Sequence, residues 1–217
     1  MQINEKKTKA MEFNCSKKFQ FSTELKFNNS KIDIETQTKL LGTIVTNKLS
    51  WDAKTNDVVK KTNARMQILH AISKFGAPIN DMKEIYFSYI RSLLEQSCNV
   101  WHTSLTKENE ENLERVQKSA LKIILKNNYY DYANACSKLD ITDLKTRRQQ
   151  LFERFTLQNI NHPLMKEYFI ENNKNAYSLR NPEKFKVTQS KSERFRKSTV
   201  IQMQYAANNL YKQGKIP

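Results

Sequence analysis

The feature that most constrains the fold is a change in the spacing of apolar residues at Ser50. Between residues 8 and 46, apolar and polar residues alternate in short runs, as they do in β-strands. After Ser50, apolar residues recur every three or four positions as far as Ile160, which is the spacing of helices that pack on a core. With only 3 Gly and 4 Pro in 217 residues, few tight turns are available for a larger sheet. The sequence therefore predicts a mainly α fold with a small N-terminal β portion, an α+β arrangement.

Short strands are expected in the N-terminal segment. The run Thr8–Asn14 alternates as a strand does, but it has no partner before it. The segments KFQFSTELKF and KIDIE read as a hairpin with Asn28, Asn29 and Ser30 at its tip. The run KLLGTIV reads as a single buried strand, in which Gly42 marks a bulge or the close approach of another backbone.

Helices are expected over residues 52–75, 79–96, from the N-cap Thr106 to about 125, 132–139 and 142–160. The second has the clearest amphipathic pattern, with one wide apolar face. That face contains Ile85, Tyr86, Tyr89, Ile90, Leu93 and Leu94. The third has acidic residues in its first turn, where the helix dipole favours them, and should bury Leu113, Val116, Ala120 and Ile123 or Ile124. Beyond Pro163 the chain carries 11 Lys and Arg against 4 acidic residues. Weak order is expected there before about Val200, although the stretch VIQMQYAANNLY could dock.

The net charge of +15 favours nucleic acid or an anionic membrane surface as a partner. No apolar run approaches the roughly 20 residues that span a bilayer, and no signal-type segment is seen, so we expect an intracellular protein, cytoplasmic or nuclear, with no membrane partner. Three cysteines, an odd number without metal-site spacing, fit a reducing compartment. Cys98 and His102 lack the second pair of ligands that zinc would need.

Positive charge follows two of the expected helices. Arg115, Lys118, Lys122 and Lys126 line one face of the third helix, and Lys54, Lys61 and Arg65 line one face of the first. Such a stripe can be a solvated face alone, but two stripes with a basic tail favour a phosphate-binding surface. Tyr129, Tyr130 and Tyr132 could stack on bases, whereas Trp51 and Trp101 read better as core anchors.

Three further runs, in this order and spacing, carry a resemblance: KLLGTIVTNKLSWDA, SYIRSLLEQSCNVWHTSLT and LERVQKSALKIIL. They resemble the region after the catalytic palm in jockey-like reverse transcriptases of non-LTR retrotransposons. The opening NEKKTKAMEFN resembles a strand that follows the catalytic turn of that family, and KFKVTQSKSERFRKSTV resembles its closing stretch. The sequence departs from the family at Lys54–Thr55, where a His-Ile is common, and at Arg91–Ser92, where Arg-Pro is usual.

The resemblance implies a thumb-like helical bundle that follows the end of a truncated palm sheet. On this basis residues 1–48 are the end of the palm with a primer-grip-like segment, 49–127 the thumb-like bundle, 128–162 additional helices and 163–217 a basic, partly ordered tail. Leu41 and Gly42 match the turn that holds the primer end, and Lys7 would lie on the pyrophosphate side. The partner is then RNA or an RNA–DNA duplex, with the missing palm, or another chain, at the exposed strand edge.

The carboxylates that a polymerase needs are missing. Two-metal polymerisation requires clustered aspartates, and the sequence contains no Asp-Asp pair. Tyr129–Tyr130–Asp131 looks similar but lies far downstream of where the motif belongs. We therefore expect no catalytic residue, metal or cofactor in this chain, since Mg²⁺ would belong to the missing palm. The predicted function is a template-primer-binding part of an RNA-directed DNA polymerase, inactive alone; the alternatives are a helical protein-interaction module or a non-functional remnant.

Overall fold

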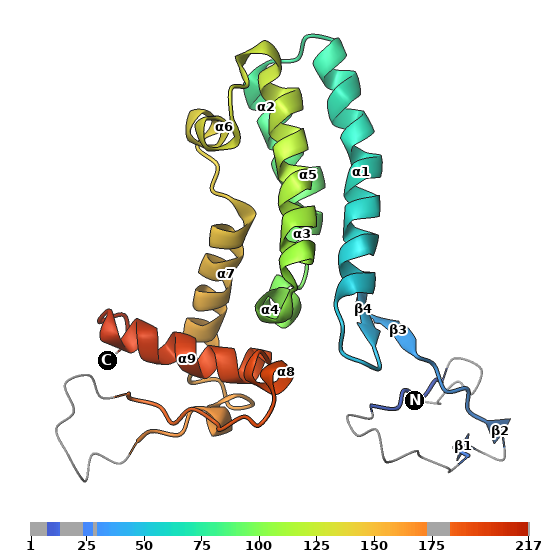
Figure 1. The fold of residues 1–217 in the computed structure, drawn as a ribbon, viewed down its shortest axis with the longest axis vertical. Helices are drawn as coiled ribbons and strands as arrows, with labels where there is room; N and C mark the ends of the chain where they lie inside the picture. Colours follow the sequence, from blue (N-terminus) through green and yellow to red (C-terminus); the bar gives the residue numbers. More distant parts are fainter. Residues whose placement is uncertain (1–7, 14–23, 28–29, 173–182, 217) are drawn as a thin grey trace. The chain divides into compact units, whose positions relative to one another are not determined.

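The computed structural model describes residues 8–13, 24–27, 30–172 and 183–216 (Figure 1). The chain divides into two compact units, Met1–Val58 and Val59–Pro217, and the division falls inside the long helix α1 (Asp52–Lys74). The predicted fold class is confirmed, because helices dominate the described residues and the strands form two small antiparallel sheets before α1.

The first sheet is a short version of the predicted hairpin. Strand β1 (Lys26–Phe27) pairs with β2 (Ser30–Lys31), with Phe27 opposite Ser30, so Ser30 belongs to a strand and not to the tip. The predicted strand over Thr8–Asn14 is wrong for the part described. Only Ala10 forms a bridge there, parallel to Ile34. A single bridge leaves most main-chain groups of that segment outside any ladder, so no sheet is built from it.

The second sheet corrects the interpretation of KLLGTIV as one buried strand. Strand β3 (Gln37–Leu40) pairs with β4 (Thr43–Thr46), and Leu41 and Gly42 form the turn between them. Both turn residues have positive φ, +47° and +82°. Two positive φ values are the pattern of a type I′ turn, whose twist matches that of the flanking strands. Glycine adopts such a φ without strain, whereas leucine rarely does, so the residue pattern alone does not reveal the turn; only the resemblance placed a turn at Leu41 and Gly42.

Helix α1 begins and ends where the sequence predicts. It stops at Lys74 because Gly76, with φ +76°, reverses the chain in a Schellman motif. The Gly76 amide donates to the carbonyl of Ser73 (3.2 Å), and the Ala77 amide donates to that of Ile72 (3.3 Å). These two bonds satisfy carbonyl groups that the end of the helix would otherwise leave without donors.

The predicted second helix is continuous but not uniform. Its α-helical ends, α2 (Ile79–Ile85) and α3 (Ser92–Glu95), flank a π-helical segment, Tyr86–Arg91. Its most buried side chains are Met82, Tyr86, Ile90 and Leu94. These residues lie four apart and form a narrower buried face than the sequence predicts, because Tyr89, expected on that face, is 51% exposed. Wide turns of this kind shift the face that a helix presents, and periodicity alone does not indicate them.

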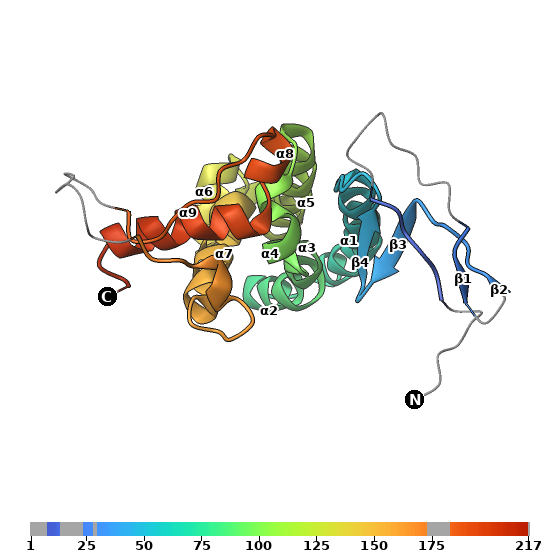
Figure 2. The same ribbon diagram turned by 90° about the horizontal axis from the view of Figure 1, so that it is seen from below.

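After a left-handed residue at Ser97, the short helix α4 (Cys98–Trp101) and a 3₁₀ turn (His102–Ser104) lead to α5 (Lys107–Leu125). The predicted N-cap is confirmed, because the Thr106 hydroxyl accepts a hydrogen bond from the Asn109 amide at 3.2 Å. A 3₁₀ turn (Lys126–Asn128), α6 (Tyr132–Leu139) and α7 (Leu144–Asn159) follow. Both views show α5 between the second half of α1 and α7 (Figures 1 and 2).

The C-terminal segment packs more extensively than the sequence predicts. A 3₁₀ turn (Lys166–Tyr168) and α8 (Glu193–Arg196) precede α9 (Thr199–Lys212), which lies across α7 (Figure 1). Residues of α7, α9, the segments between them and the chain after α9 form an apolar cluster. It consists of Phe152, Ile160, Phe169, Phe185, Met203, Ala206, Ala207, Leu210 and Ile216. The predicted docking of VIQMQYAANNLY is confirmed, but the weak order expected before Val200 is wrong for Phe169 and Phe185, which are both buried.

Two amide side chains of α9 hold this segment in place. Asn208 is buried and bonds to both main-chain groups of Phe185: its Oδ1 accepts from the amide at 2.8 Å and its Nδ2 donates to the carbonyl at 2.9 Å. One turn earlier, the Gln204 side chain accepts from the Thr188 amide and donates to the Tyr168 carbonyl. These bonds replace the sheet partners that an extended segment would otherwise need.

Candidate functional site

The basic residues predicted on α1 are largely engaged within the protein. Lys54 is 1% exposed, and its Nζ donates to the Gly42 carbonyl at 3.5 Å. Lys61 is half-buried. The Arg65 Nη1 donates to the main-chain carbonyl of Tyr89 at 2.7 Å, and its guanidinium carbon lies 6.0 Å from the centre of the Tyr89 ring. The prediction of a solvent-facing stripe is therefore wrong for Lys54, and Arg65 is bound to the protein itself.

The contact of Arg65 has a clear structural role. Tyr89 belongs to the π-helical segment, and its carbonyl oxygen has two lone pairs, so it can accept from Arg65 in addition to a main-chain donor. Hydrogen bonds from a charged donor are about twice as strong as neutral ones. Arg65 thus ties α1 to the π-helical segment.

The basic residues of α5 are arranged differently. Arg115, Lys118 and Lys122 are exposed, and Lys126 is exposed just after the last turn. The Lys118 Nζ lies 5.1 Å from the centre of the Tyr132 ring, and the Lys122 Nζ lies 5.4 Å from that of Tyr129. Arg115 donates to the Asn112 side chain of its own helix at 3.2 Å.

The two tyrosines fix the position of these ammonium groups without neutralising them. A cation over an aromatic face is attracted to the ring, but the ring carries no net charge. Lys118 and Lys122 are four residues apart, so they lie on the same face of α5. The structure therefore presents two exposed cations whose side-chain freedom is already reduced, which lowers the entropic cost of binding a ligand.

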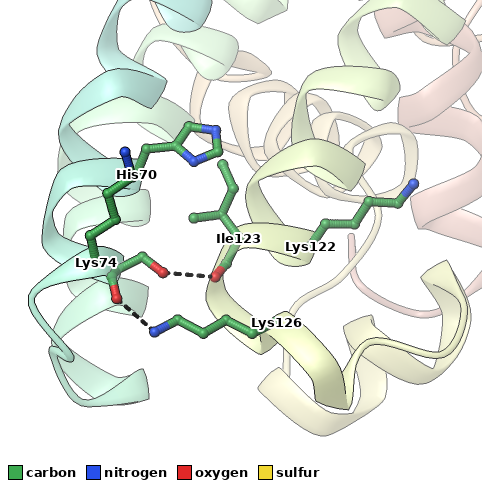
Figure 3. Close-up of a pocket in the computed structure, with 6 residues that line it drawn as sticks. His70, Lys74, Lys122, Ile123 and Lys126 are labelled. Atoms are coloured by element: carbon green, nitrogen blue, oxygen red, sulfur yellow. Dashed lines mark hydrogen bonds between the residues drawn. The ribbon is translucent and has the colours of Figure 1, made fainter.

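A shallow cleft of about 560 Å³ lies between the C-terminal turns of α1 and α5. Its lining residues are His70, Ser73, Lys74, Lys122, Ile123 and Lys126 (Figure 3). These six include three lysines and a histidine but no carboxylate. The cleft lies wholly within the unit Val59–Pro217.

Helix ends position the cations of this cleft. The Lys126 Nζ donates to the Ser73 carbonyl at 2.6 Å, and the Ser73 hydroxyl donates to the Ile123 carbonyl at 3.4 Å. The C-terminal end of a helix carries a partial negative charge, so it attracts an ammonium group such as that of Lys126. Figure 3 shows Lys126 reaching across toward α1, while Lys122 extends away from it. The cations therefore spread along the rim and do not converge on one point, an arrangement that suits a chain of phosphates better than one small anion.

Sequence reasoning found two of these lining residues, Lys122 and Lys126, and missed the others. His70 and Lys74 are four residues apart in the last turns of α1, so they share a face of that helix. That spacing beside the FGAP stop was the signal that could have identified them. The contribution of Ser73 depends on a contact fifty residues away in the sequence, which no local pattern indicates.

The remaining predicted site residues lie elsewhere. Leu41 and Gly42 form the β3–β4 turn in the first unit, where Leu41 is 92% exposed, and Lys7 lies outside the described residues. Asp131 is the N-cap of α6 and accepts a hydrogen bond from the Asn134 amide at 2.7 Å. This capping role explains why an aspartate follows Tyr129 and Tyr130, the sequence that resembles part of a polymerase motif. Trp101 is a buried core residue, as predicted.

A buried polar network below the α5 surface was not predicted. Gln117 is fully buried; its Oε1 accepts from the Tyr86 hydroxyl at 2.5 Å, and its Nε2 donates to the Tyr132 hydroxyl at 2.8 Å and the Thr142 carbonyl at 3.0 Å. Tyr132 also donates to the carboxylate of Glu114. Burial raises the pKa of both tyrosines, so both hydroxyls stay protonated at neutral pH. The network fixes Tyr132, and with it the ring under Lys118.

One buried cation stands apart from all of these. Arg148 of α7 is fully buried, and among the described residues none accepts a hydrogen bond from its three guanidinium nitrogens. Burial lowers the pKa of Arg148. A buried charge without an acceptor is costly, because the interior does not replace the hydration that it loses.

Within the described ranges no group of three His, Cys, Asp or Glu side chains could hold a metal ion, and no helix there is long and apolar enough to cross a membrane. Comparisons with known protein families, with curated proteins and with solved structures find no match to this chain. The resemblance to non-LTR reverse transcriptases thus stays a prediction from the sequence.

Proposed function

We infer that this protein binds nucleic acid, RNA or an RNA–DNA duplex, through phosphate contacts along α5 and the adjoining cleft. The observation that carries this inference is the row of tyrosine-held cations, Lys118 and Lys122, leading to the cleft with Lys74 and Lys126. Contacts of this kind position a nucleic-acid backbone and do not read its sequence. This is the role that the resemblance to a reverse-transcriptase thumb implies, and no polymerase chemistry is attributed to the chain alone.

The inference predicts a steep dependence of affinity on salt. If about four phosphates are neutralised, the plot of log affinity against log salt concentration should have a slope of about −3 to −4. The measurement is fluorescence anisotropy of a labelled RNA of roughly 16 nucleotides, alone or annealed to DNA, between about 50 and 200 mM salt. A flat response would overturn the inference.

A matched pair of variants tests which cations are used. The double variant Lys118→Gln/Lys122→Gln should reduce the magnitude of the slope by about 1.5 to 2 and weaken binding about tenfold at low salt. The control, Lys107→Gln/Lys212→Gln, removes the same charge from exposed positions at the start of α5 and the end of α9. Equal losses in both variants would show that net charge alone accounts for binding.

A protein partner is the second candidate, favoured by the β3–β4 hairpin. Leu40 and Leu41 at its tip are 63% and 92% exposed, an unusual concentration of apolar surface in a turn. A hairpin that serves as an interface should produce a self-associated species in light scattering coupled to size exclusion, and Leu41→Asn should abolish it. A monomer at every concentration would leave nucleic-acid binding as the better account.

A further inference from the structure

The two most exposed aromatic rings among the described residues adjoin the lysine-lined cleft in the sequence. Phe75 is 91% exposed and follows Lys74 directly. Tyr130 is 84% exposed and follows Tyr129, whose ring lies under Lys122. Tyr89 is the next most exposed of the aromatic side chains that the structure describes, at 51%. The exposure of Phe75 and Tyr130 is therefore a local property of the segments beside the cleft.

The main chain at both rings is well defined. The Phe75 amide donates to the Ala71 carbonyl at 3.2 Å, and Gly76 closes the Schellman motif directly after it. Tyr130 lies between Tyr129, whose amide donates to the Lys126 carbonyl at 3.1 Å, and the helix N-cap Asp131. Both rings are thus presented to solvent by fixed turns next to residues of the cleft.

Exposed rings that adjoin cation-bearing residues along the chain match the chemistry of one class of ligand. A single exposed aromatic residue is ordinary, but rings next to a phosphate-binding row supply stacking platforms for bases. In a duplex the faces of the bases are already stacked on one another, so these rings would gain nothing from them. In a single strand the faces are accessible, and each stack is independent of the identity of the base.

We propose that the cleft and the two rings that adjoin its residues in the sequence bind single-stranded nucleic acid, with the phosphates along Lys118 and Lys122 and unpaired bases stacked on Phe75 and Tyr130. This proposal rests on the proposed function and narrows it, because it assigns a preference for unpaired over paired strands. Positive charge supplies affinity for any nucleic acid, whereas the rings supply affinity only for accessible bases.

The test compares the same labelled RNA, roughly 16 nucleotides long, as a single strand and annealed to complementary DNA. The wild-type chain should bind the single strand at least tenfold more tightly. Replacing either ring, by Phe75→Ala or Tyr130→Ala, should weaken single-strand binding roughly 5- to 150-fold, with the salt slope and duplex affinity unchanged. Tyr205→Ala, an exposed tyrosine of α9, is the matched control and should change neither affinity.

The outcomes separate this proposal from the broader one. Duplex binding as tight as single-strand binding, with no effect of the ring variants, overturns the single-strand proposal and leaves phosphate binding intact. If neither the single strand nor the duplex binds in a salt-dependent manner, both the single-strand proposal and the proposed function are overturned. Circular dichroism of each variant, matched to the wild-type spectrum, shows whether a loss of affinity reflects a loss of fold.

Discussion

Helices α1 and α5 each carry basic residues on one face, yet the structure uses them differently. On α1, Lys54 is buried against a turn carbonyl and Arg65 donates to a carbonyl of the π-helical segment. On α5, Lys118 and Lys122 face solvent over tyrosine rings. Spacing places cations on a face, but the availability of acceptors decides whether that face binds the protein or a ligand. Carbonyl acceptors occupy Lys54 and Arg65, and neutral rings leave Lys118 and Lys122 accessible.

Arg148 carries this comparison to its extreme, as a buried cation without an acceptor among the described residues. Arg148→Met keeps most of the side-chain volume and removes the charge. We expect the variant to be more stable by about 1 to 3 kcal/mol, because removal of the desolvated charge outweighs the loss of its attraction to the carboxylates of Glu114 and Glu110. Urea unfolding followed by circular dichroism measures this change. Arg147→Met is the control; because Arg147 pairs with Glu95 at 3.2 Å, no gain is expected. A less stable Arg148→Met would show that an acceptor does hold the guanidinium.

Arg65→Gln tests the internal role assigned to α1. The substitution removes a hydrogen bond from a charged donor to the Tyr89 carbonyl and should lower the free energy of unfolding by about 2 kcal/mol. The salt slope for RNA binding should stay the same. The side chain of Arg115 makes an exposed hydrogen bond to Asn112, so Arg115→Gln should change stability by less than about 0.5 kcal/mol. If Arg65→Gln reduced the slope and spared stability, the contrast between the two helices would fail.

Lys126 and Lys122 repeat the contrast within one cleft. Lys126→Met removes the bond to the Ser73 carbonyl and should destabilise the protein by about 1.5 kcal/mol, whereas Lys122→Met should change stability by no more than about 0.5 kcal/mol. Thermal unfolding of both variants under one buffer condition gives the difference directly. Equal stabilities would mean that Lys126 is as free to serve a ligand as Lys122.

Gly76→Ala probes the turn that holds the Ser73 carbonyl in place. A Cβ at this position meets no atom within 4 Å, so the expected loss of about 1 kcal/mol comes from the positive φ alone. Gly214→Ala provides a matched comparison, since Gly214 has φ +71° and equally open space at the end of α9. Similar losses in chemical denaturation are expected for the two. An unchanged Gly76→Ala would show that this helix end adapts without left-handed backbone.

The helices could be predicted from the sequence because their signals are local. Thr106 caps α5, Gly76 stops α1, and apolar periodicity marks the faces between them. The β3–β4 turn could not be predicted from local signals. Leucine rarely adopts a positive φ, and the apolar residues of KLLGTIV suit one continuous strand. The π-helical segment was not predicted either, because its wider turns require no distinctive residue types.

Only part of the candidate site could be predicted, because sequence spacing locates cations but not the groups that bind them. Charge spacing indicated Lys118, Lys122 and Lys126, which the structure places on the α5 surface and at the cleft. Lys54 and Arg65 donate hydrogen bonds to main-chain carbonyls and so are not available to a ligand. Every residue has such a carbonyl, and no sequence pattern indicates which one will accept the bond. The same holds for Gln117, whose partners are distant in the chain.

The amide pair on α9 has a consequence for how this segment can change over evolutionary time. Gln204 and Asn208 recognise the main chain around Phe185 and Thr188, and main-chain atoms are common to all residues. Between residues 183 and 188, change is therefore tolerated at side chains that make no contact of their own. Phe185 is constrained by the apolar cluster, Thr188 by the bond from Gln204 to its hydroxyl, and Lys184 by its pair with Glu171. The two amides themselves have little such freedom. Sequence variation in this region should thus be uneven, permissive at the remaining positions of the extended segment and restricted at the two amides of the helix that holds it.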